Sequence, residues 1–208
     1  MTRRALLIGF SLVVIGLAIV VSPITAAAIT VNTPADLADL SIADGICDAD
    51  AAAGIQCTLR AAIETAEVLS GADTINFSIT GVISLAQPLP PITTDLIVDA
   101  PSAALLTIQR VAGSTPFRLI DQTGGLLIMR GLHLSGGAAD NGGAIRSAGM
   151  LLLSEVEISA STASQNGGAI YTEGSISLDK VTLRSNAAQM GGAIYGAENA
   201  VITIIAAS

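Results

Sequence analysis

Aromatic side chains are almost absent from this sequence, which has three Phe, two Tyr and no Trp among 208 residues. A globular core of that size normally includes several large rings, because each ring buries a large apolar area. Here 51% of the residues are hydrophobic, so Ile, Leu, Val and Ala must fill the interior. This composition favours a thin core lined by stacked aliphatic rows.

Positive charge and metal-binding side chains are also scarce. The chain has 9 Lys and Arg against 17 Asp and Glu, a formal net charge of −8. Nucleic-acid binding needs clustered cations that neutralise phosphates, so no nucleic-acid partner is expected. The single histidine, His133, is far from the two cysteines, which argues against a zinc site. No glycine-rich phosphate loop or nucleophile elbow is found, and we expect no cofactor and no metal.

The N-terminal segment 1–28 has the layout of a secretory signal peptide. A short basic start precedes an apolar run that ends at Val21. Ala26 and Ala28 then supply small residues at positions −3 and −1 of a cleavage site. We therefore predict a signal peptide over 1–28, a mature chain that begins at or near Ile29, and a secreted or cell-surface protein. If the run is retained, it would be a membrane anchor, which is the only membrane contact that we expect.

Because an exported chain enters an oxidising compartment, its two cysteines are expected to be paired. Cys47 and Cys57 are predicted to form a disulfide, as cysteine pairs do in oxidising compartments. Asp44, Asp48 and Asp50 are spaced loosely like a Ca²⁺-binding loop, but the distal Glu of that pattern is missing. We favour the alternative, an Asp-rich turn beside the disulfide.

Residues 29–105 form a first region in which a helix precedes several strands. The segment 58–69 has apolar residues at helical spacing, and Thr58 can cap its first turn. After Gly71 the pattern becomes that of strands, bounded by Gly and Pro, over 74–79, 82–85, 95–100 and 105–109.

Residues 106–208 form a second region that repeats. The tetrapeptide Gly-Gly-Ala-Ile occurs at 142–145, 167–170 and 191–194, at an almost constant interval. A fixed period of this length indicates a solenoid, in which each repeat forms one coil and stacking buries the shared apolar rows. Strands stacked coil upon coil are parallel, and the glycines form the corners between them. The sequence therefore predicts an all-β parallel β-helix.

Two segments also resemble known families. The stretch "CTLRAA" at 57–62 is similar to the Cys-Ser-Leu-Arg-Glu-Ala motif of bacterial CSLREA-domain proteins, with differences at its second and fifth positions. The GGAI repeats are similar to those of polymorphic outer-membrane proteins, where GGAI alternates with Phe-x-x-Asn. The segment 183–186 occupies that second slot, with Leu183 in place of Phe.

This resemblance spans most of residues 29–196 and implies a right-handed parallel β-helix of the pectate-lyase-like superfold. It implies a large secreted or surface-displayed bacterial protein without an enzymatic site. The helix at 58–69 would then cap the open N-terminal end of the solenoid, and Cys47–Cys57 would tether the preceding loop to that cap.

Outward-facing positions of aligned coils form columns. One column contains His133, Glu157 and Thr182, and its neighbour contains Glu155 and Lys180. Glu155 and Glu157 are two residues apart on a predicted strand, about 6–7 Å, a separation at which glycosidases use paired carboxylates. We favour ordinary pairing of Glu155 with Lys180 and of Glu157 with His133, because no substrate cleft is predicted nearby.

A third column contains Arg146, Tyr171 and Tyr195, each directly after a GGAI copy. Stacking in register permits a ring stack and a cation–π contact. Both a surface-binding strip and a purely stabilising ladder explain this column, and the ladder is the simpler explanation.

Two functions remain after this reasoning. We expect a structural or adhesive β-helical protein that is not an enzyme and that contacts cell-surface glycans or the surface proteins of a host or neighbouring cell. The alternative is a polysaccharide lyase or glycosidase that uses His133, Glu155 and Glu157. The final segment, 200–205, begins a coil that the sequence does not complete, which predicts either a truncated piece of a longer protein or end-to-end self-association.

Overall fold

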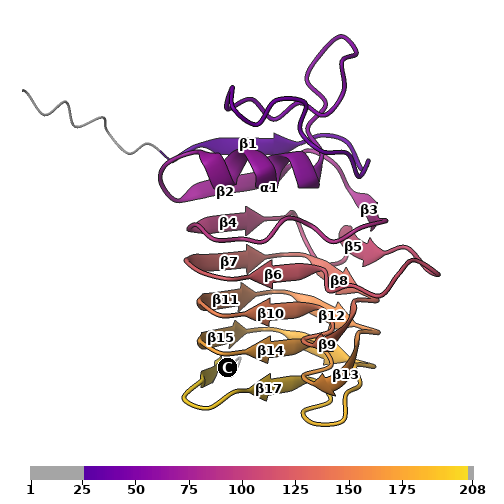
Figure 1. Ribbon diagram of the computed structural model, residues 1–208, viewed down its shortest axis with the longest axis vertical. Coiled ribbons are helices and arrows are strands. Elements are labelled where there is room, and N and C mark those ends of the chain that lie inside the picture. The colour runs from indigo at the N-terminus through magenta and orange to yellow at the C-terminus, as the bar shows by residue number, and fades with distance from the viewer. Residues whose placement is uncertain (1–25, 206–208) are drawn as a thin grey trace, which may run out of the picture.

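The chain folds as a β-solenoid of about 5 turns, in which parallel strands stack from coil to coil (Figure 1). The computed structural model describes residues 26–205. The all-β parallel solenoid predicted from the repeats is confirmed, with a single short helix among the described residues. The predicted signal peptide lies almost entirely outside the described residues.

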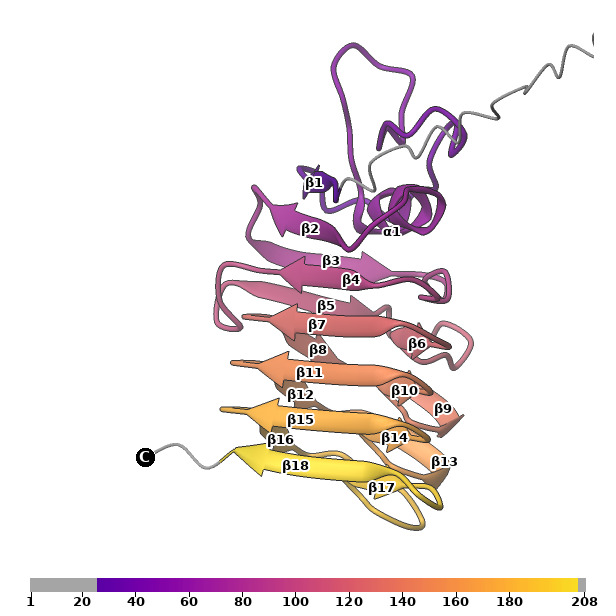
Figure 2. The same ribbon diagram turned by 90° about the vertical axis from the view of Figure 1, so that its left-hand side faces the viewer.

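Four parallel sheets form the walls of the solenoid, stacked as Figure 2 shows. Sheet A runs along its whole length through β1 (Ala28–Val31), β2 (Asp73–Phe77), β4 (Leu96–Asp99), β7 (Leu126–Arg130), β11 (Met150–Ser154), β15 (Ser175–Asp179) and β18 (Val201–Ile205). Sheet B contains β3 (Gly81–Leu85), β5 (Leu106–Arg110), β8 (His133–Ser135), β12 (Glu157–Ser159) and β16 (Thr182–Arg184). Sheet C contains β6 (Ile120–Gln122), β10 (Ile145–Ser147), β14 (Ile170–Thr172) and β17 (Ile194–Gly196). Sheet D is the pair β9 (Ala138–Asn141) and β13 (Thr162–Asn166).

The interior is built from aliphatic rows that follow the register of these sheets. In sheet A, Leu151 pairs with Leu127 on one side and with Ile176 on the other, as the repeat alignment predicts. In sheet B, Ile158 lies between Leu134 and Leu183 in the same way. Burying each such side chain contributes about 1.5–3 kcal/mol relative to leaving it exposed, so the rows supply the main stabilisation.

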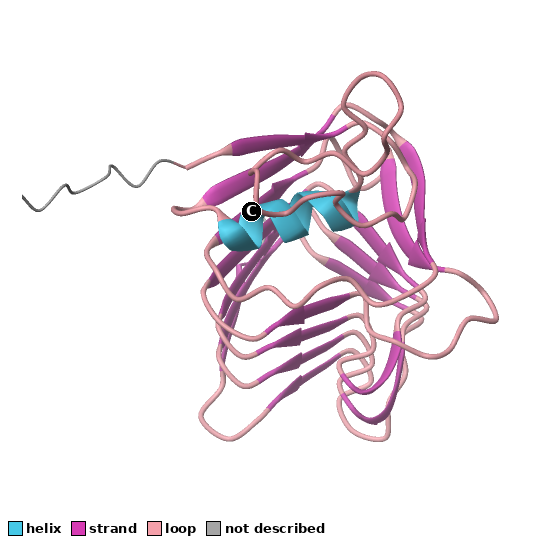
Figure 3. Ribbon diagram, turned by 45° about the horizontal axis from the view of Figure 1, so that its top comes forward, coloured by secondary structure: helices cyan, strands magenta, loops and turns pink. Residues whose placement is uncertain are grey.

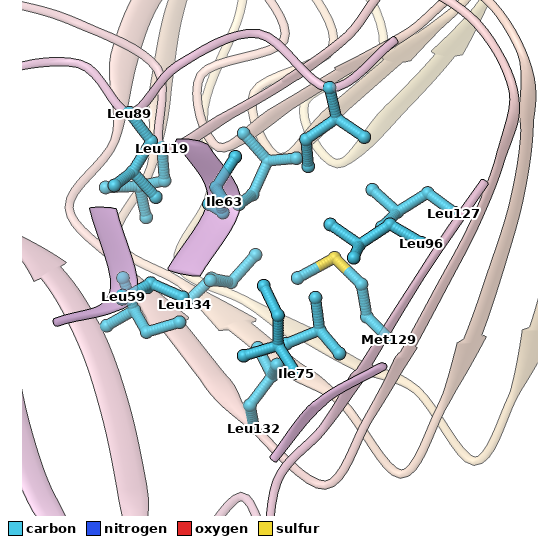
Figure 4. Packing of buried hydrophobic residues seen from close by; sticks show 14 of the residues in the cluster. Leu59, Ile63, Ile75, Leu89, Leu96, Leu119, Leu127, Met129, Leu132 and Leu134 are labelled. Atoms are coloured by element: carbon cyan, nitrogen blue, oxygen red, sulfur yellow. The ribbon is translucent and has the colours of Figure 1, made fainter. Parts of the chain in front are cut away.

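The helix α1 (Leu59–Val68) lies across the N-terminal end of the solenoid (Figure 3). Thr58 caps it as predicted, because its hydroxyl accepts a hydrogen bond from the Ala61 N–H at 3.0 Å. Leu59 and Ile63 are both buried and point into the same interior as the strand residues, as Figure 4 shows. The helix thus covers the apolar end of the solenoid.

The loop that precedes α1 is fixed to it at two points. Cys47 and Cys57 form the predicted disulfide. Arg60 on α1 donates from Nε to Asp36 Oδ1 at 2.8 Å, and its Nη1 donates to the Pro88 carbonyl at 2.6 Å. Arg60 therefore joins the N-terminal loop to the segment that connects the first coils.

Each Gly-Gly-Ala-Ile copy forms a corner, and its two glycines have different reasons for being glycine. Gly167 has a left-handed backbone, with φ of 64°, which costs L-residues energy but not glycine. Gly168 lies against the next coil, where an added Cβ would come within 2.1 Å of the Gly192 carbonyl oxygen. In the copy at 167–170, conformation requires the first glycine, where an added Cβ would also come within 2.1 Å of the Ile170 carbonyl oxygen, and space requires the second. In the last copy the second glycine, Gly192, has room for a Cβ.

The last described rung, β18, continues the inward rows but leaves them exposed. Ile202 and Ile204 pair with Ile176 and Leu178, yet 42% and 71% of their surfaces are exposed. Beside them lies a hollow of about 270 Å³ lined by residues of the last coils. No helix within residues 26–205 has the length and apolar character needed to span a membrane.

Candidate functional site

A groove of about 860 Å³ lies against the outside of sheet D. One side is formed by strands β9 and β13, and the other by the segments 88–91 and 116–118. Eight of the thirteen lining residues are apolar and five are polar or charged. The groove is lined by Pro88, Leu89, Pro91, Pro116, Phe117, Arg118, Asp121, Ala138, Ala139, Asp140, Thr162, Ala163 and Ser164. An apolar hollow with a few convergent polar groups is the usual form of a ligand site.

The charged pair in this groove is incompletely hydrogen-bonded. Arg118 Nη1 lies 3.5 Å from Asp121 Oδ1, and both atoms are buried without a hydrogen-bond partner among residues 26–205. Burial lowers the pKa of Arg118, and the nearby Asp121 carboxylate opposes that shift. A guanidinium nevertheless stays charged at neutral pH. Each of these two atoms costs about 1–3 kcal/mol when it is left unsatisfied.

Asp121 also begins an outward column on sheet C. The register pairs Asp121 with Arg146, Arg146 with Tyr171, and Tyr171 with Tyr195. The two tyrosine rings are 3° from parallel, with centroids 5.8 Å apart. The ring stack expected from the sequence is therefore present, and it belongs to a column that extends into the groove.

Arg146 interacts with carboxylates on both sides of the column. Its Nη2 donates to Glu173 Oε1 at 3.0 Å, and its Nη1 lies 3.7 Å from Asp121 Oδ1. The hydrogen bond to Glu173 is the main reason that the pKa of Arg146 is raised. The sequence suggested a cation–π contact for this residue, whereas the structure aligns its guanidinium with these two carboxylates.

On the acidic face of sheet B, the ring of His133 is held mainly by hydroxyl groups, while Glu157 pairs with a cation. His133 Nε2 lies 3.6 Å from Glu157 Oε1, the predicted neighbour, but only 2.7 Å from Ser159 Oγ. The other ring nitrogen, Nδ1, lies 3.3 Å from Thr107 Oγ1. Burial lowers the pKa of His133, and the Glu157 carboxylate opposes this shift. Glu157 also accepts a hydrogen bond from Arg184.

Glu155 departs from the arrangement expected for it. It is not on a strand with Glu157 but in the corner between β11 and β12, where its backbone is left-handed with φ of 56°. Lys180 occupies the same corner one coil later, with φ of 51°, and its Nζ donates to Glu155 Oε1 at 3.0 Å. Both side chains are more than half exposed, so this ion pair contributes little stability. Neither Glu155 nor Glu157 lines the groove.

The Asp-rich loop uses its carboxylates to hold turns. Asp44 Oδ1 accepts the N–H of Ile46 at 2.8 Å, and Asp50 Oδ1 accepts that of Ala52 at 3.1 Å. Asp48 Oδ1 accepts the Gln56 N–H at 3.0 Å, which ties the two ends of the loop together. Among residues 26–205 no cluster of three or more His, Cys, Asp or Glu side chains could hold a metal ion.

Three residues around the groove and the tyrosine column, Asp121, Arg118 and Glu173, were not predicted from the sequence. Asp121 could have been found, because it lies one repeat period before Arg146. Arg118 and Glu173 lie outside the repeated strand positions, so the period says nothing about where they point. The groove itself depends on loops that do not repeat.

In comparisons with known proteins, no family model matches this chain, and no curated protein and no solved structure matches it significantly.

Proposed function

We propose that this chain is a secreted or surface-displayed β-solenoid with a structural and adhesive role, which contacts cell-surface glycans. The contact surface, here called the groove–tyrosine surface, consists of Arg118, Asp121, Arg146, Tyr171 and Tyr195. The observation that carries the proposal is that the groove and the tyrosine column form one continuous surface. Asp121 lines the groove, pairs in register with Arg146, and so joins the groove to the tyrosine stack.

The chemistry of this surface suits a polyhydroxylated ligand. Aromatic rings pack against the apolar faces of sugars, while guanidinium and carboxylate groups hydrogen-bond hydroxyls in a directional way. The side chains of Arg146 and Asp121 are both one-third exposed, so they are accessible to a ligand. A parallel solenoid keeps these groups at fixed spacing, because each coil is hydrogen-bonded to the next.

Binding to a panel of immobilised polysaccharides, some neutral and some acidic, tests the proposal. We expect retention of the wild-type chain on at least one of them, and at least tenfold weaker binding for Tyr195→Ala and Arg118→Ala. Lys180→Ala is the matched control, because it removes an exposed cation from another face and should bind like wild type. Failure to bind any polysaccharide, or equal binding by all variants, would reject the groove–tyrosine surface.

The same polysaccharides, assayed for new reducing ends, test the alternative of a lyase or glycosidase. We expect no turnover, since Glu155 and Glu157 are engaged by separate cations and lie outside the groove. Cleavage that disappears in Glu157→Gln would instead assign the acidic face a catalytic role.

The exposed rung β18 supports one further part of the proposal, end-to-end self-association. Exposed strand edges and apolar rows favour pairing with another chain. We expect the apparent mass of the chain 29–208 to rise with concentration in a sizing experiment, and Ile204→Asp to reduce that rise. A single monomeric species at all concentrations would contradict it.

A further inference from the structure

Asp73 occupies an inward position of sheet A at which all of the following coils have Leu or Ile. It is the first residue of β2, and its relative exposure is 0%. The register continues from Asp73 through the inward row of Leu96, Leu127, Leu151, Ile176 and Ile202. A carboxylate in such a row is expensive to bury unless a partner compensates its charge.

The contacts of Asp73 point to the chain segment directly above it. Its Oδ1 accepts the Ala27 backbone N–H at 2.7 Å. Its Oδ2 is buried and has no hydrogen-bond partner among residues 26–205, and no ion pair in that range includes Asp73. One neutral amide is therefore all that the described chain offers to this carboxylate.

Ala27 belongs to the segment in which a signal peptide would be removed. Ala26, Ala27 and Ala28 follow one another, so each of three consecutive peptide bonds has a small residue at position −1, while position −3 is Ile24, Thr25 or Ala26 in turn. Hydrolysis of the bond between Ala26 and Ala27 would turn the nitrogen that already contacts Asp73 into an α-amino group. Such a group has a pKa of about 8 and carries a positive charge at neutral pH.

We propose that a signal peptidase cleaves the Ala26–Ala27 bond and that Asp73 binds the new N-terminal ammonium. Water supplies the hydroxyl that completes the Ala26 carboxylate, and the Ala27 nitrogen takes up the protons of an ammonium. The ammonium then offers three donors to the two Asp73 oxygens, in place of one amide hydrogen. This site refines the mature start expected near Ile29, and it rests on the export that is part of the proposed function.

The two neighbouring bonds are poorer choices on structural grounds. A chain that begins at Ala28 or Ile29 lacks the Ala27 N–H that Asp73 accepts. It also lacks the Ala27 carbonyl, which accepts the Thr74 N–H at 2.8 Å and continues the ladder of sheet A. Cleavage at either bond would remove the one hydrogen-bond donor that the described chain gives to this carboxylate.

Intact-mass analysis of the full-length chain, after expression in a bacterial host that exports it, tests the cleavage site. We expect a product that begins at Ala27. A product that begins at Ala28 or Ile29 overturns this inference and leaves export standing. A product that retains the whole segment 1–26 overturns the inference and the secreted form of the proposed function, and leaves the surface-displayed form with this segment as its anchor.

A second experiment tests the ion pair without depending on export. The chain 27–208 is prepared with a free and with an acetylated Ala27 amine, and thermal unfolding midpoints are compared. We expect acetylation to lower the midpoint by roughly 3–8 °C in wild type, since an ammonium–carboxylate ion pair is replaced by a single hydrogen bond from a neutral amide. Asp73→Asn and Asp73→Leu should abolish that difference, and Asp73→Leu also restores the aliphatic row in case the amide variant folds poorly.

Asp99→Asn is the matched control, because it removes an exposed carboxylate from the same sheet. It should keep the full effect of acetylation. An acetylation effect that is absent in wild type, or equally large in Asp73→Leu, overturns the ion pair.

Discussion

Tyr171 and Tyr195 lie one coil apart, with ring planes 3° from parallel and centroids 5.8 Å apart. The register of sheet C produces this stack, because the two residues are direct partners in parallel strands. The stack therefore depends on the pairing of β17 with β14 in the correct register, whether or not a ligand is bound.

Removal of one ring should lower stability by a modest and measurable amount. We expect Tyr195→Ala to reduce the free energy of unfolding by about 1 kcal/mol through the lost stacking. Tyr195→Phe keeps the ring and should stay close to wild type. A double-mutant cycle with Tyr171→Ala isolates the pair, and a coupling energy of zero would show that the stacking contributes nothing.

His133 should make stability fall as the pH falls below its ordinary pKa of 6.5. Burial lowers its pKa in the folded chain, with Glu157 opposing and Arg184 assisting the shift, so the unfolded chain takes up a proton first. Stability is then complete above pH 6.5 and decreases down to the folded pKa, by at most about 1.4 kcal/mol per pH unit.

Urea unfolding of wild type and His133→Gln between pH 7.5 and pH 5 measures this effect. The glutamine variant keeps hydrogen-bonding capacity toward Thr107 and Ser159 but does not titrate, so its stability should fall less. Parallel pH profiles for the two proteins would contradict the prediction.

The disulfide should stabilise the N-terminal cap. Closing a loop of about ten residues contributes roughly 2–3 kcal/mol by restricting the unfolded chain. We expect a reductant to lower the unfolding midpoint of wild type and to leave the Cys47→Ala/Cys57→Ala variant unchanged. Equal sensitivity of both proteins to the reductant would mean that the effect does not come from this bond.

The second glycine of the repeat offers a matched pair of substitutions. Gly168→Ala places a Cβ 2.1 Å from the Gly192 carbonyl oxygen, and we expect a loss of roughly 2–3 kcal/mol from this overpacking. At Gly192 an added Cβ meets only the Asn186 carbonyl oxygen, at 3.6 Å, so Gly192→Ala should be nearly neutral. Chemical denaturation of the two variants measures the difference, and similar losses in both would refute the clash.

The repeats made the coils readable from the sequence. The period aligned Leu127, Leu151 and Ile176, and the structure pairs these residues in the same order. The disulfide and the capped helix were also predicted correctly, because each depends on residues close together in the chain. Stacked columns follow directly from one interval, so the tyrosine pair could be found without coordinates.

The repeat period could not predict features that depend on corners or on loops that do not repeat. Glu155 was placed on a strand because alternation suggested it, but the residue takes a left-handed corner conformation that glycine fills one coil earlier, at Gly131. The groove requires the segments 88–91 and 116–118 to approach sheet D, and no period relates these segments to one another. Asp73 lies just before the predicted strand 74–79, and only the register shows which row it interrupts.

Because the coils stack in register, the length of this molecule can change only in steps of one coil. Each repeat adds one strand spacing, about 4.8 Å, to the long axis and leaves the cross-section unchanged. A deletion or duplication of one whole period, for example 126–149, would preserve every row and shift the tyrosine pair by a single step. A deletion of half a period would place strand residues of every later coil against corner residues of the coil before it. Gain or loss of whole repeats can therefore change the length of the solenoid while its buried aliphatic rows stay the same.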